Sequence, residues 1–560
     1  MNRYADTILV NGNVVTMDSR QPRARGVAVR GDSIVAISPP DDLDDIAGPG
    51  TLIVDLAGRT VTPGLIDGHA HLDREGLKYL YPSLAGARSV ADVLALVKQA
   101  AASRPPGEWV VTMPIGTPPW YFDGPETLAE GRGPTRQELD AAVPDHPVYI
   151  RGPWGYWNKP PLSSFASSLA LQKAGIDRDT QSPSPTVVIE RDPETGEPTG
   201  AFRETYSIPI LELTLFRCVP RFTHQDRVRG IRHAMTLYAS AGTTSVYEGH
   251  GVAPEVIQAY HALWQSGEQT VRAALVLSPT WTSPDEAERT LADWLPYAAG
   301  RGFGDDRLRI GGVFVPLGGH PDVARAAHAA LPYTAWAGFV NQASTPDEFR
   351  AYARVVLRHG HRLNTTVGED LDAVLDVLEP LAASLPVADR QIVLEHLRIV
   401  SPAAIQRMKR LRAVVTTQPA SYIWKSGPEA LSRVGDGEQI VPHRALLDAG
   451  LPFVLSTDNK PYQMLFALWA ALARTARETG QVIGPGQAIT REEALRAMTL
   501  DAARITFEED RKGSIAPGKL ADLVVFAEDP LTVPLDALPD LPVELTMIGG
   551  QIVHRAATLP

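Results

Sequence analysis

The chain has 560 residues, 44% of them hydrophobic, and its 65 acidic and 53 basic side chains give a net charge of −12 at pH 7. Single cores rarely grow beyond about 250–300 residues, so this length predicts one large domain and a smaller one. The acidic excess is dispersed and no apolar stretch reaches the roughly 18 residues of a membrane span, which argues against nucleic acid and membrane as partners.

The single cysteine, Cys218, excludes an internal disulfide and a cysteine-based zinc site. Cysteine-poor chains are typical of a reducing compartment, and the N-terminus lacks the pattern of a signal peptide. We therefore expect a cytoplasmic protein. Any metal must bind to histidine, carboxylate or modified lysine side chains.

Both chain ends have the pattern of short β-strands. Runs such as GVAVRGDSIVAIS and KLADLVVF are rich in Val and Ile and are separated by Gly, Asp and Pro. Because chain termini often lie close together, residues 1–60 and 505–560 are expected to form one composite β-sandwich domain.

Residues 61–504 alternate between short apolar runs and helical patterns. The strand candidates are VTPGLID, HPVYIRG, TTSVYEG, VRAALVLSP, LRIGGVFVP, HRLNTTV, RQIVLEH, RAVVTTQ and LPFVLSTD. Such alternation predicts a parallel sheet, and about eight units predict an α/β fold with a (β/α)8 TIM barrel. Residues from about 104 to 215 begin with segments rich in Pro, Gly and aromatic side chains, which predict an insertion over the barrel mouth.

The stretch PGLIDGHAHLD carries His69 and His71 at the end of the first barrel-strand candidate. Residues i and i+2 of a strand point to the same face, so both imidazoles can bind one ion. An arbitrary H-x-H pair is more often structural. The position at a strand end, where barrel enzymes carry their chemistry, favours metal ligands here.

Two later strand candidates end in further ligand types. LPFVLSTD ends in Asp458, whose carboxylate could bind the ion and accept a proton from water, although an aspartate there also suits a helix N-cap. RQIVLEH ends in His396, which could bind the ion, stabilise an oxyanion or have a purely structural role.

With these motifs, the sequence resembles the amidohydrolase superfamily. TVTPGLIDGHAHLD, RQIVLEH, LSTD and GSIAPGKLADLVVF carry the resemblance, and PTRQELDAAVPDHPVYIRG, PETGEPTGAFRE and GTTSVYEG are similar to its YtcJ-like branch, also called amidohydrolase family 3. The resemblance covers essentially the whole chain. It implies a (β/α)8 barrel with a composite sandwich and metal-assisted hydrolysis of C–N bonds, with His69, His71, His396 and Asp458 at the metal.

The sequence departs from this family pattern at two positions. Relatives commonly carry a lysine that bridges two metals where this chain has Phe314, and a histidine on the fifth strand where it has Thr365, followed by Glu369 in place of an aspartate. Phenylalanine cannot bind a metal and threonine is at best a weak ligand. We therefore expect a single ion, held by His69, His71 and Asp458 with His396 as a possible fourth ligand.

Other residues are candidates for the substrate site. Glu248 and His250 lie two positions apart in TTSVYEGHG, so both can face one cavity, where ligation, substrate contact and a structural role are all open; we predict substrate contact. His320 in PLGGHPD is a further candidate for the missing ligand, although such a loop more often forms a turn. The insertion supplies aromatic candidates for the pocket wall: Trp120, Trp154 and Tyr156.

The resulting hypothesis is a metal-dependent hydrolase that cleaves an amide or other C–N bond of a small apolar or aromatic substrate. One Zn²⁺ per chain is favoured by the His and carboxylate ligands, with Mn, Fe or Co as alternatives. Asp458 would accept a proton from a water molecule that the ion activates, and His396 would stabilise the developing oxyanion.

Three alternatives stay open. The same scaffold could perform a metal-dependent decarboxylation or C–C hydrolysis, it could be a catalytically silent binding barrel, or Glu248 and Asp458 could act as a metal-independent acid and base. The expected partner is a small-molecule substrate, and the resemblance implies a homodimer or a larger homo-oligomer.

Overall fold

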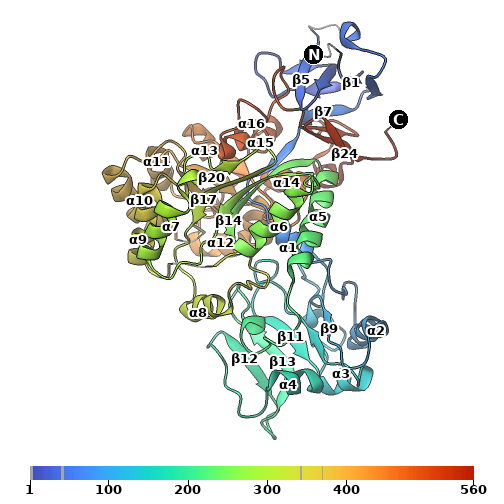
Figure 1. Cartoon of the computed structure of the whole chain (residues 1–560), viewed down its shortest axis with the longest axis vertical. Coiled ribbons are helices and arrows are strands. Elements are labelled where there is room, and N and C mark those ends of the chain that lie inside the picture. The colour runs from blue at the N-terminus through green and yellow to red at the C-terminus, as the bar shows by residue number, and fades with distance from the viewer. Residues whose placement is uncertain (1–3, 40–42, 341–342, 369, 560) are drawn as a thin grey trace.

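The computed structural model describes residues 4–39, 43–340, 343–368 and 370–559. Three parts follow one another along its long axis (Figure 1): sheets formed by the two chain ends, a barrel with its helices, and a separate sheet within residues 110–204. Within these ranges, no helix has the length and apolar character needed to cross a membrane.

The central sheet is a nearly closed barrel of parallel strands. In chain order its strands are β8 (Leu65–Asp67), β14 (Thr243–Val252), β15 (Arg272–Leu277), β17 (Leu308–Phe314), β18 (Leu363–Thr366), β19 (Ile392–Glu395), β20 (Val414–Thr417) and β21 (Phe453–Leu455), and β16 (Phe303–Gly304) pairs with β17 outside the barrel order. The first and last strands meet where Asp458 N donates to the carbonyl of His69 at 2.9 Å. The predicted fold class is confirmed.

Helices surround the barrel. They are α1 (Leu72–Leu77), α5 (His224–Ser240), α6 (Pro254–Gln265), α7 (Pro284–Asp293), α8 (Pro321–Ala330), α9 (Pro346–Arg358), α10 (Leu371–Ser384), α11 (Pro402–Arg410), α12 (Gly427–Val434), α13 (His443–Asp448), α14 (Met464–Ala473), α15 (Arg491–Ala497) and α16 (Leu500–Ala503). Helix α9 illustrates their sequence signals: Thr345 caps its N-terminus, Pro346 occupies the first turn, and buried Phe349, Tyr352 and Val356 follow the spacing of a helix face.

Strands from both chain ends share one sheet. Six strands lie in the order β24 (Gln551–Arg555), β23 (Val543–Ile548), β22 (Leu523–Phe526), β7 (Thr60–Pro63), β2 (Asn13–Val15) and β3 (Arg23–Ala24). A second sheet has the order β5 (Ser33–Ser38), β4 (Gly26–Arg30), β1 (Thr7–Val10) and β6 (Leu52–Asp55). The predicted strand VTPGLID is thus divided, because its first half pairs with β22 and only its second half enters the barrel.

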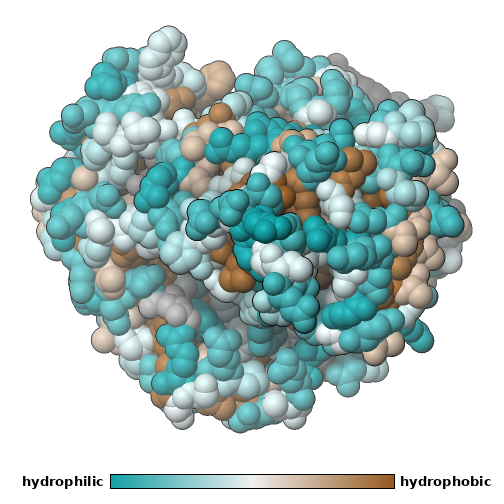
Figure 2. All heavy atoms as spheres, turned by 90° about the horizontal axis from the view of Figure 1, so that it is seen from below, coloured by the Kyte–Doolittle hydropathy of each residue, from teal (hydrophilic) through white to brown (hydrophobic). Residues whose placement is uncertain are grey.

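The insertion forms a third sheet. Its order is β12 (Val187–Arg191), β13 (Pro198–Glu204), β11 (Leu162–Ala166), β10 (Val148–Ile150) and β9 (Val110–Thr112). The prediction that HPVYIRG is a barrel strand is wrong, because it forms β10 of this sheet. Alternation of strands and helices along the chain does not show which sheet a strand joins. Helix α2 (Val90–Ala101) packs on this sheet with α3 (Arg136–Ala142) and α4 (Ser168–Ala174), so this part of the chain begins before residue 104. Seen from below (Figure 2), the surface is largely hydrophilic, with apolar residues in small groups.

Candidate metal centre

Five side chains with metal-binding atoms converge at the carboxyl ends of the barrel strands. His69 and His71 follow β8, His250 lies near the end of β14, and His396 and Asp458 follow β19 and β21. Two overlapping groups have ligand atoms within 4.8 Å of one another: His69 with His71 and His250, and His69 with His396 and Asp458. The predicted ligands therefore lie together, and His250, for which ligation was left open and substrate contact predicted, lies among them.

The distances between these atoms are close to those of neighbouring ligands on one ion. His69 Nε2 lies 3.0 Å from His396 Nε2, and His71 Nε2 lies 3.1 Å from Asp458 Oδ1. His69 Nε2 and His396 Nε2 each lie 3.9 Å from an oxygen of Asp458. Bonds of about 2.0–2.1 Å to a tetrahedral ion place ligand atoms at about these separations.

A buried carboxylate stands behind each histidine of the H-x-H pair. Glu395 Oε2 contacts His69 Nδ1, and Glu248 Oε2 lies 3.2 Å from His71 Nδ1. Glu248 also accepts a hydrogen bond from Leu72 N at 2.8 Å. An imidazole that donates from Nδ1 to a carboxylate presents the lone pair of Nε2 toward the centre, as in metal sites.

Arg74 adds a second partner for His71. Its Nη2 lies 2.9 Å from the same Nδ1 atom that Glu248 approaches. Glu248 favours the tautomer of His71 with its proton on Nδ1, whereas Arg74 favours the tautomer with its proton on Nε2. A cation bound at Nε2 selects the first, in which Nδ1 donates to Glu248.

Burial keeps the imidazoles neutral. It lowers the pKa of His69 to about 3 and the pKa values of His71, His250 and His396 well below the ordinary range. A neutral imidazole is the form that binds a metal. Burial also raises the pKa values of Glu248 and Glu395 well above the usual range, and a cation among the histidines would favour their ionised forms.

Asp458 has a different partner on each oxygen. Oδ1 faces His71, and Oδ2 contacts the ammonium of Lys460, whose side chain is buried. Burial opposes ionisation of this carboxyl group, but Lys460, His71 and His396 together outweigh it, and the pKa of Asp458 lies well below its ordinary value. Asp458 is therefore charged.

Local backbone structure holds these side chains in place. His396 and Asp458 have left-handed backbone conformations, with φ of 66° and 52°, which non-glycine residues seldom adopt and which often mark functional sites. Asp67 joins the first and last barrel strands, since Oδ1 accepts from the backbone N–H groups of His69 and Thr457, each at 3.1 Å. Burial raises the pKa of Asp67 to about 7.

The two family departures lie where the sequence suggested. Phe314 ends β17 and is buried, with its ring centroid 5.5 Å from that of His250. Thr365 lies within β18 and is also buried. Neither can replace a lysine or histidine ligand. Glu369, which belongs to the second departure, lies outside the described residues.

A cavity of about 210 Å³ opens beside the histidines. Its lining includes five Tyr and Phe side chains and one carboxylate, Asp370: Tyr156, Tyr206, His250, Phe314, Pro316, Leu317, Gly318, Gly319, Phe339, Thr366, Val367, Gly368, Asp370, His396 and Tyr422. The hydroxyl group of Tyr422 lies 2.5 Å from His396 Nδ1. This cavity is the candidate substrate site because it adjoins the ligand cluster.

Of the residues predicted to contact substrate, Tyr156 and His250 line this cavity. Glu248 lies behind His71, and its position suits orientation of that ligand. Trp154 and Trp120 are buried in aromatic packing, Trp154 against Tyr156 and Phe339 and Trp120 against Phe122 and Trp424. These two tryptophans pack the insertion onto the barrel. They are not among the described residues that line the cavity.

His320, the remaining ligand candidate, caps α8 by accepting from Asp322 N and lies outside the cluster, as expected for a turn.

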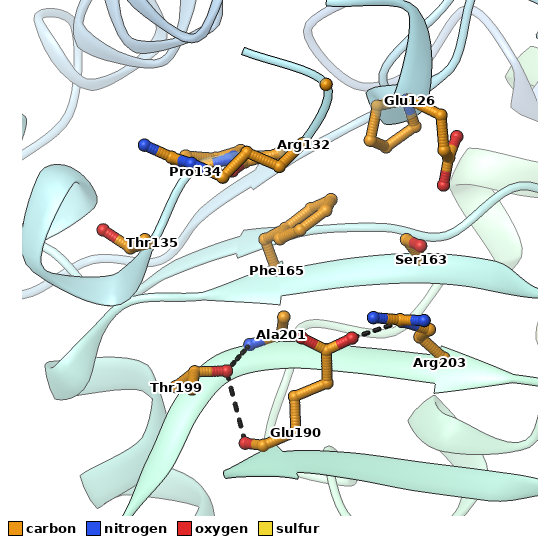
Figure 3. Close-up of a pocket in the computed structure, with 13 residues that line it drawn as sticks. Glu126, Arg132, Pro134, Thr135, Ser163, Phe165, Glu190, Thr199, Ala201 and Arg203 are labelled. Carbon is orange, nitrogen blue, oxygen red and sulfur yellow. Dashed lines mark hydrogen bonds and ion pairs between the residues drawn. The ribbon is translucent and has the colours of Figure 1, made fainter. Parts of the chain in front are cut away.

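A larger cavity of about 420 Å³ lies in the insertion, away from the histidines. Figure 3 shows that side chains of β11 and β13 form one wall and the loop before α3 the other, with Arg203 paired to Glu190. No histidine is among its described lining residues. This cavity has no set of metal ligands, so we do not assign the chemistry to it.

The residues fit a divalent ion. His250 Nδ1 is a buried nitrogen atom without a hydrogen bond in the described part of the chain. Such atoms are costly unless a ligand satisfies them. Imidazole and carboxylate donors suit zinc and similar transition metals.

The sequence analysis did not identify Glu395, Asp67 or Arg74 as residues that support these ligands. For Glu395 a signal was available, because it is an acid beside a predicted ligand at a strand end.

Comparison with known proteins agrees with this geometry. The model of the amidohydrolase family matches residues 52–554. An N-substituted formamide deformylase of Arthrobacter pascens is 26% identical, with 99% of each chain covered. The putative amidohydrolase YtcJ of Bacillus subtilis is 23% identical, with 97% of this chain and 98% of YtcJ covered.

Solved structures share the fold. A metal-dependent hydrolase from Pyrococcus furiosus matches with a TM-score of 0.68 and 23% identity over 94% of this chain and all of that one. The atrazine chlorohydrolase TrzN of Arthrobacter aurescens, complexed with zinc, matches with a TM-score of 0.51 and 16% identity over 98% of this chain and 95% of TrzN. The predicted enzyme class, a metal-dependent amidohydrolase, is confirmed: the chain belongs to the amidohydrolase family, in its YtcJ-like branch.

Proposed function

We propose that this enzyme hydrolyses an amide or other C–N bond of a small substrate with an apolar or aromatic group, using one divalent ion. The observation that carries the proposal is the cluster of His69, His71, His396 and Asp458 beside this cavity, in which neighbouring ligand atoms lie 3.0 to 3.9 Å apart. Zinc is the preferred ion because neutral imidazoles and a carboxylate suit it. The zinc in TrzN supports this choice.

In this proposal His69, His71 and Asp458 hold the ion. A divalent ion in such a site lowers the pKa of a water molecule and polarises a carbonyl group. Asp458 accepts the proton of the attacking water at a carboxylate oxygen, and the contact with Lys460 keeps that carboxylate ionised beforehand. His396 is held at Nδ1 by Tyr422, which leaves the Nε2–H of the neutral ring to stabilise the developing oxyanion, and Asp458 returns the proton that it took from water to the leaving nitrogen.

The cavity supports the proposed substrate class. Tyr156, Tyr206, Phe314, Phe339 and Tyr422 surround a volume of about 210 Å³, which suits one compact ring or a short branched chain. The relative from Arthrobacter pascens is a deformylase of N-substituted formamides, so amides with a small acyl group and an apolar nitrogen substituent are the first substrates to test.

Lys425 supports one wall of this cavity. Its Nζ donates to the backbone carbonyls of Tyr156, Trp157 and Asn158 at 2.9 to 3.3 Å. The contact joins the insertion to the segment that follows β20 and so fixes the position of Tyr156.

The test combines metal analysis with product analysis. Purified wild type should contain about one ion per chain, and His69→Ala and Asp458→Ala should lose both the ion and the release of amine from N-substituted formamides. His359→Ala, at the C-terminal end of α9 and outside the cluster, is the matched control and should keep both. Two ions per chain, or carbon dioxide in place of an amine, would contradict the proposal, and a metal-free wild type that binds ligand would indicate a silent barrel.

A further inference from the structure

Strand β14 carries an irregularity where it reaches the metal centre. Glu248 pairs with Leu275 and Val252 pairs with Leu277, so β14 advances four residues while β15 advances two. The extra residues form a bulge in the stretch Gly-His-Gly. Bulges beside active sites commonly redirect a side chain, and here the redirected side chain is His250.

Both glycines of this stretch are required by close contacts. A Cβ atom on Gly249 would lie 2.0 Å from Glu395 Oε2, the carboxylate that supports His69. Gly251 has a φ of 71°, and a Cβ there would lie 2.7 Å from Phe314 Cβ and 2.9 Å from Ser278 N. The backbone on either side of His250 is thus packed against the machinery of the site, which fixes its direction.

His250 points into the group of histidines. Its ring centroid lies 4.5 Å from that of His69, 5.0 Å from that of His71 and 4.7 Å from that of His396. Its Nδ1 is buried and has no hydrogen bond in the described part of the chain. A structural histidine in such a position would normally donate to or accept from a neighbour, so the bare nitrogen calls for another partner.

The site also lacks ligands at two strands. Phe314 and Thr365 occupy the positions where the family resemblance places the bridging lysine and the fifth-strand histidine, and neither supplies a nitrogen atom. Phe314 packs against His250 instead, with ring centroids 5.5 Å apart.

We propose that His250 is a metal ligand supplied by the second barrel strand, and that it replaces the nitrogen ligand that Thr365 cannot provide. His69, His71 and His250 then form a three-imidazole face, with Asp458 on the side of the barrel closure. This assignment leaves His396 free for the substrate. Three histidine ligands with an open position are a common arrangement in catalytic zinc sites. The inference rests on the proposed metal-dependent function.

Cobalt binding tests this assignment without any measurement of activity. The metal-free protein is titrated with Co²⁺ in a Cys218→Ser background, because Cys218 is exposed and could bind the ion by itself. In that background His250→Cys places a thiolate at the position of the imidazole. If residue 250 is a ligand, Co²⁺ binding produces a thiolate-to-cobalt charge-transfer band that the parent protein lacks.

His250→Ala gives the second measurement. It should weaken Co²⁺ binding by more than the roughly 10- to 100-fold that loss of an outer hydrogen-bond partner causes. His320→Ala is the matched control, since His320 also follows a glycine and precedes a barrel helix but lies outside the cluster.

Two results would overturn the inference in different ways. Unchanged Co²⁺ affinity in His250→Ala, together with no new band in His250→Cys, would make His250 part of the cavity wall and leave the proposed function intact. A parent protein that binds no Co²⁺ at all would remove the proposed function and this inference together.

Discussion

The contact between Glu395 and His69 gives the sharpest prediction for metal affinity. Both side chains are fully buried, and Glu395 Oε2 faces His69 Nδ1. Glu395→Gln keeps the shape of the side chain, which matters because Gly249 leaves no spare room beside it. The amide can donate to Nδ1, and this would place the proton of His69 on Nε2, where it blocks metal binding.

We expect Glu395→Gln to weaken metal binding about 10- to 100-fold, which corresponds to about 1.4–2.7 kcal/mol. The affinity is measured by competition with a chelator of known strength. Glu379→Gln is the matched control, because it removes the same charge from the surface of α10, where Glu379 pairs with Arg407. An equal affinity in Glu395→Gln and wild type, with the fold intact by circular dichroism, would refute the argument that Glu395 sets the tautomer of His69.

Two further predictions concern stability. Arg272 binds Asp522 through two nitrogen atoms, at 2.7 and 3.0 Å, where the barrel meets the sheets of the chain ends, and both side chains are buried. Asp522→Asn should therefore lower the free energy of unfolding, measured by urea denaturation, by about 3–5 kcal/mol. The control Arg232→Ala, which breaks an exposed ion pair, should lower it by less than about 1 kcal/mol, and equal effects of the two variants would contradict the prediction. Burial raises the pKa of Glu204 to about 8 from a reference value of 4.5. Because the unfolded chain loses this proton at lower pH than the folded one, the free energy of unfolding should fall between about pH 4.5 and 8, and Glu204→Gln should remove that slope.

The sequence alone could indicate the fold and part of the candidate site, because those signals are local. Alternation of strands and helices predicts the barrel, and strand ends predict the positions of His69, His71 and Asp458 at its carboxyl face. His250 was harder to place, since its direction depends on a bulge that only the pairing of β14 with β15 produces. Glu395 was missed because its place beside His396 at a strand end marks it only as a candidate, and does not show which histidine it faces across the barrel.

The charges around the cluster support our proposal of a single ion. Arg74 Nη2 lies 2.9 Å from His71 Nδ1, and Lys460 contacts Asp458, so two fixed positive charges already border the ligands. A second divalent ion would add two more positive charges beside them. In relatives a carboxylated lysine that bridges the two ions compensates this charge, and Phe314 cannot form such a group. Repulsion between these cations at low local dielectric would expel the second ion. The charge of one ion, by contrast, is balanced by Asp458 and by the carboxylates of Glu395 and Glu248 behind the H-x-H pair. Removal of this ion should therefore abolish hydrolysis, and addition of excess metal should not raise the rate further.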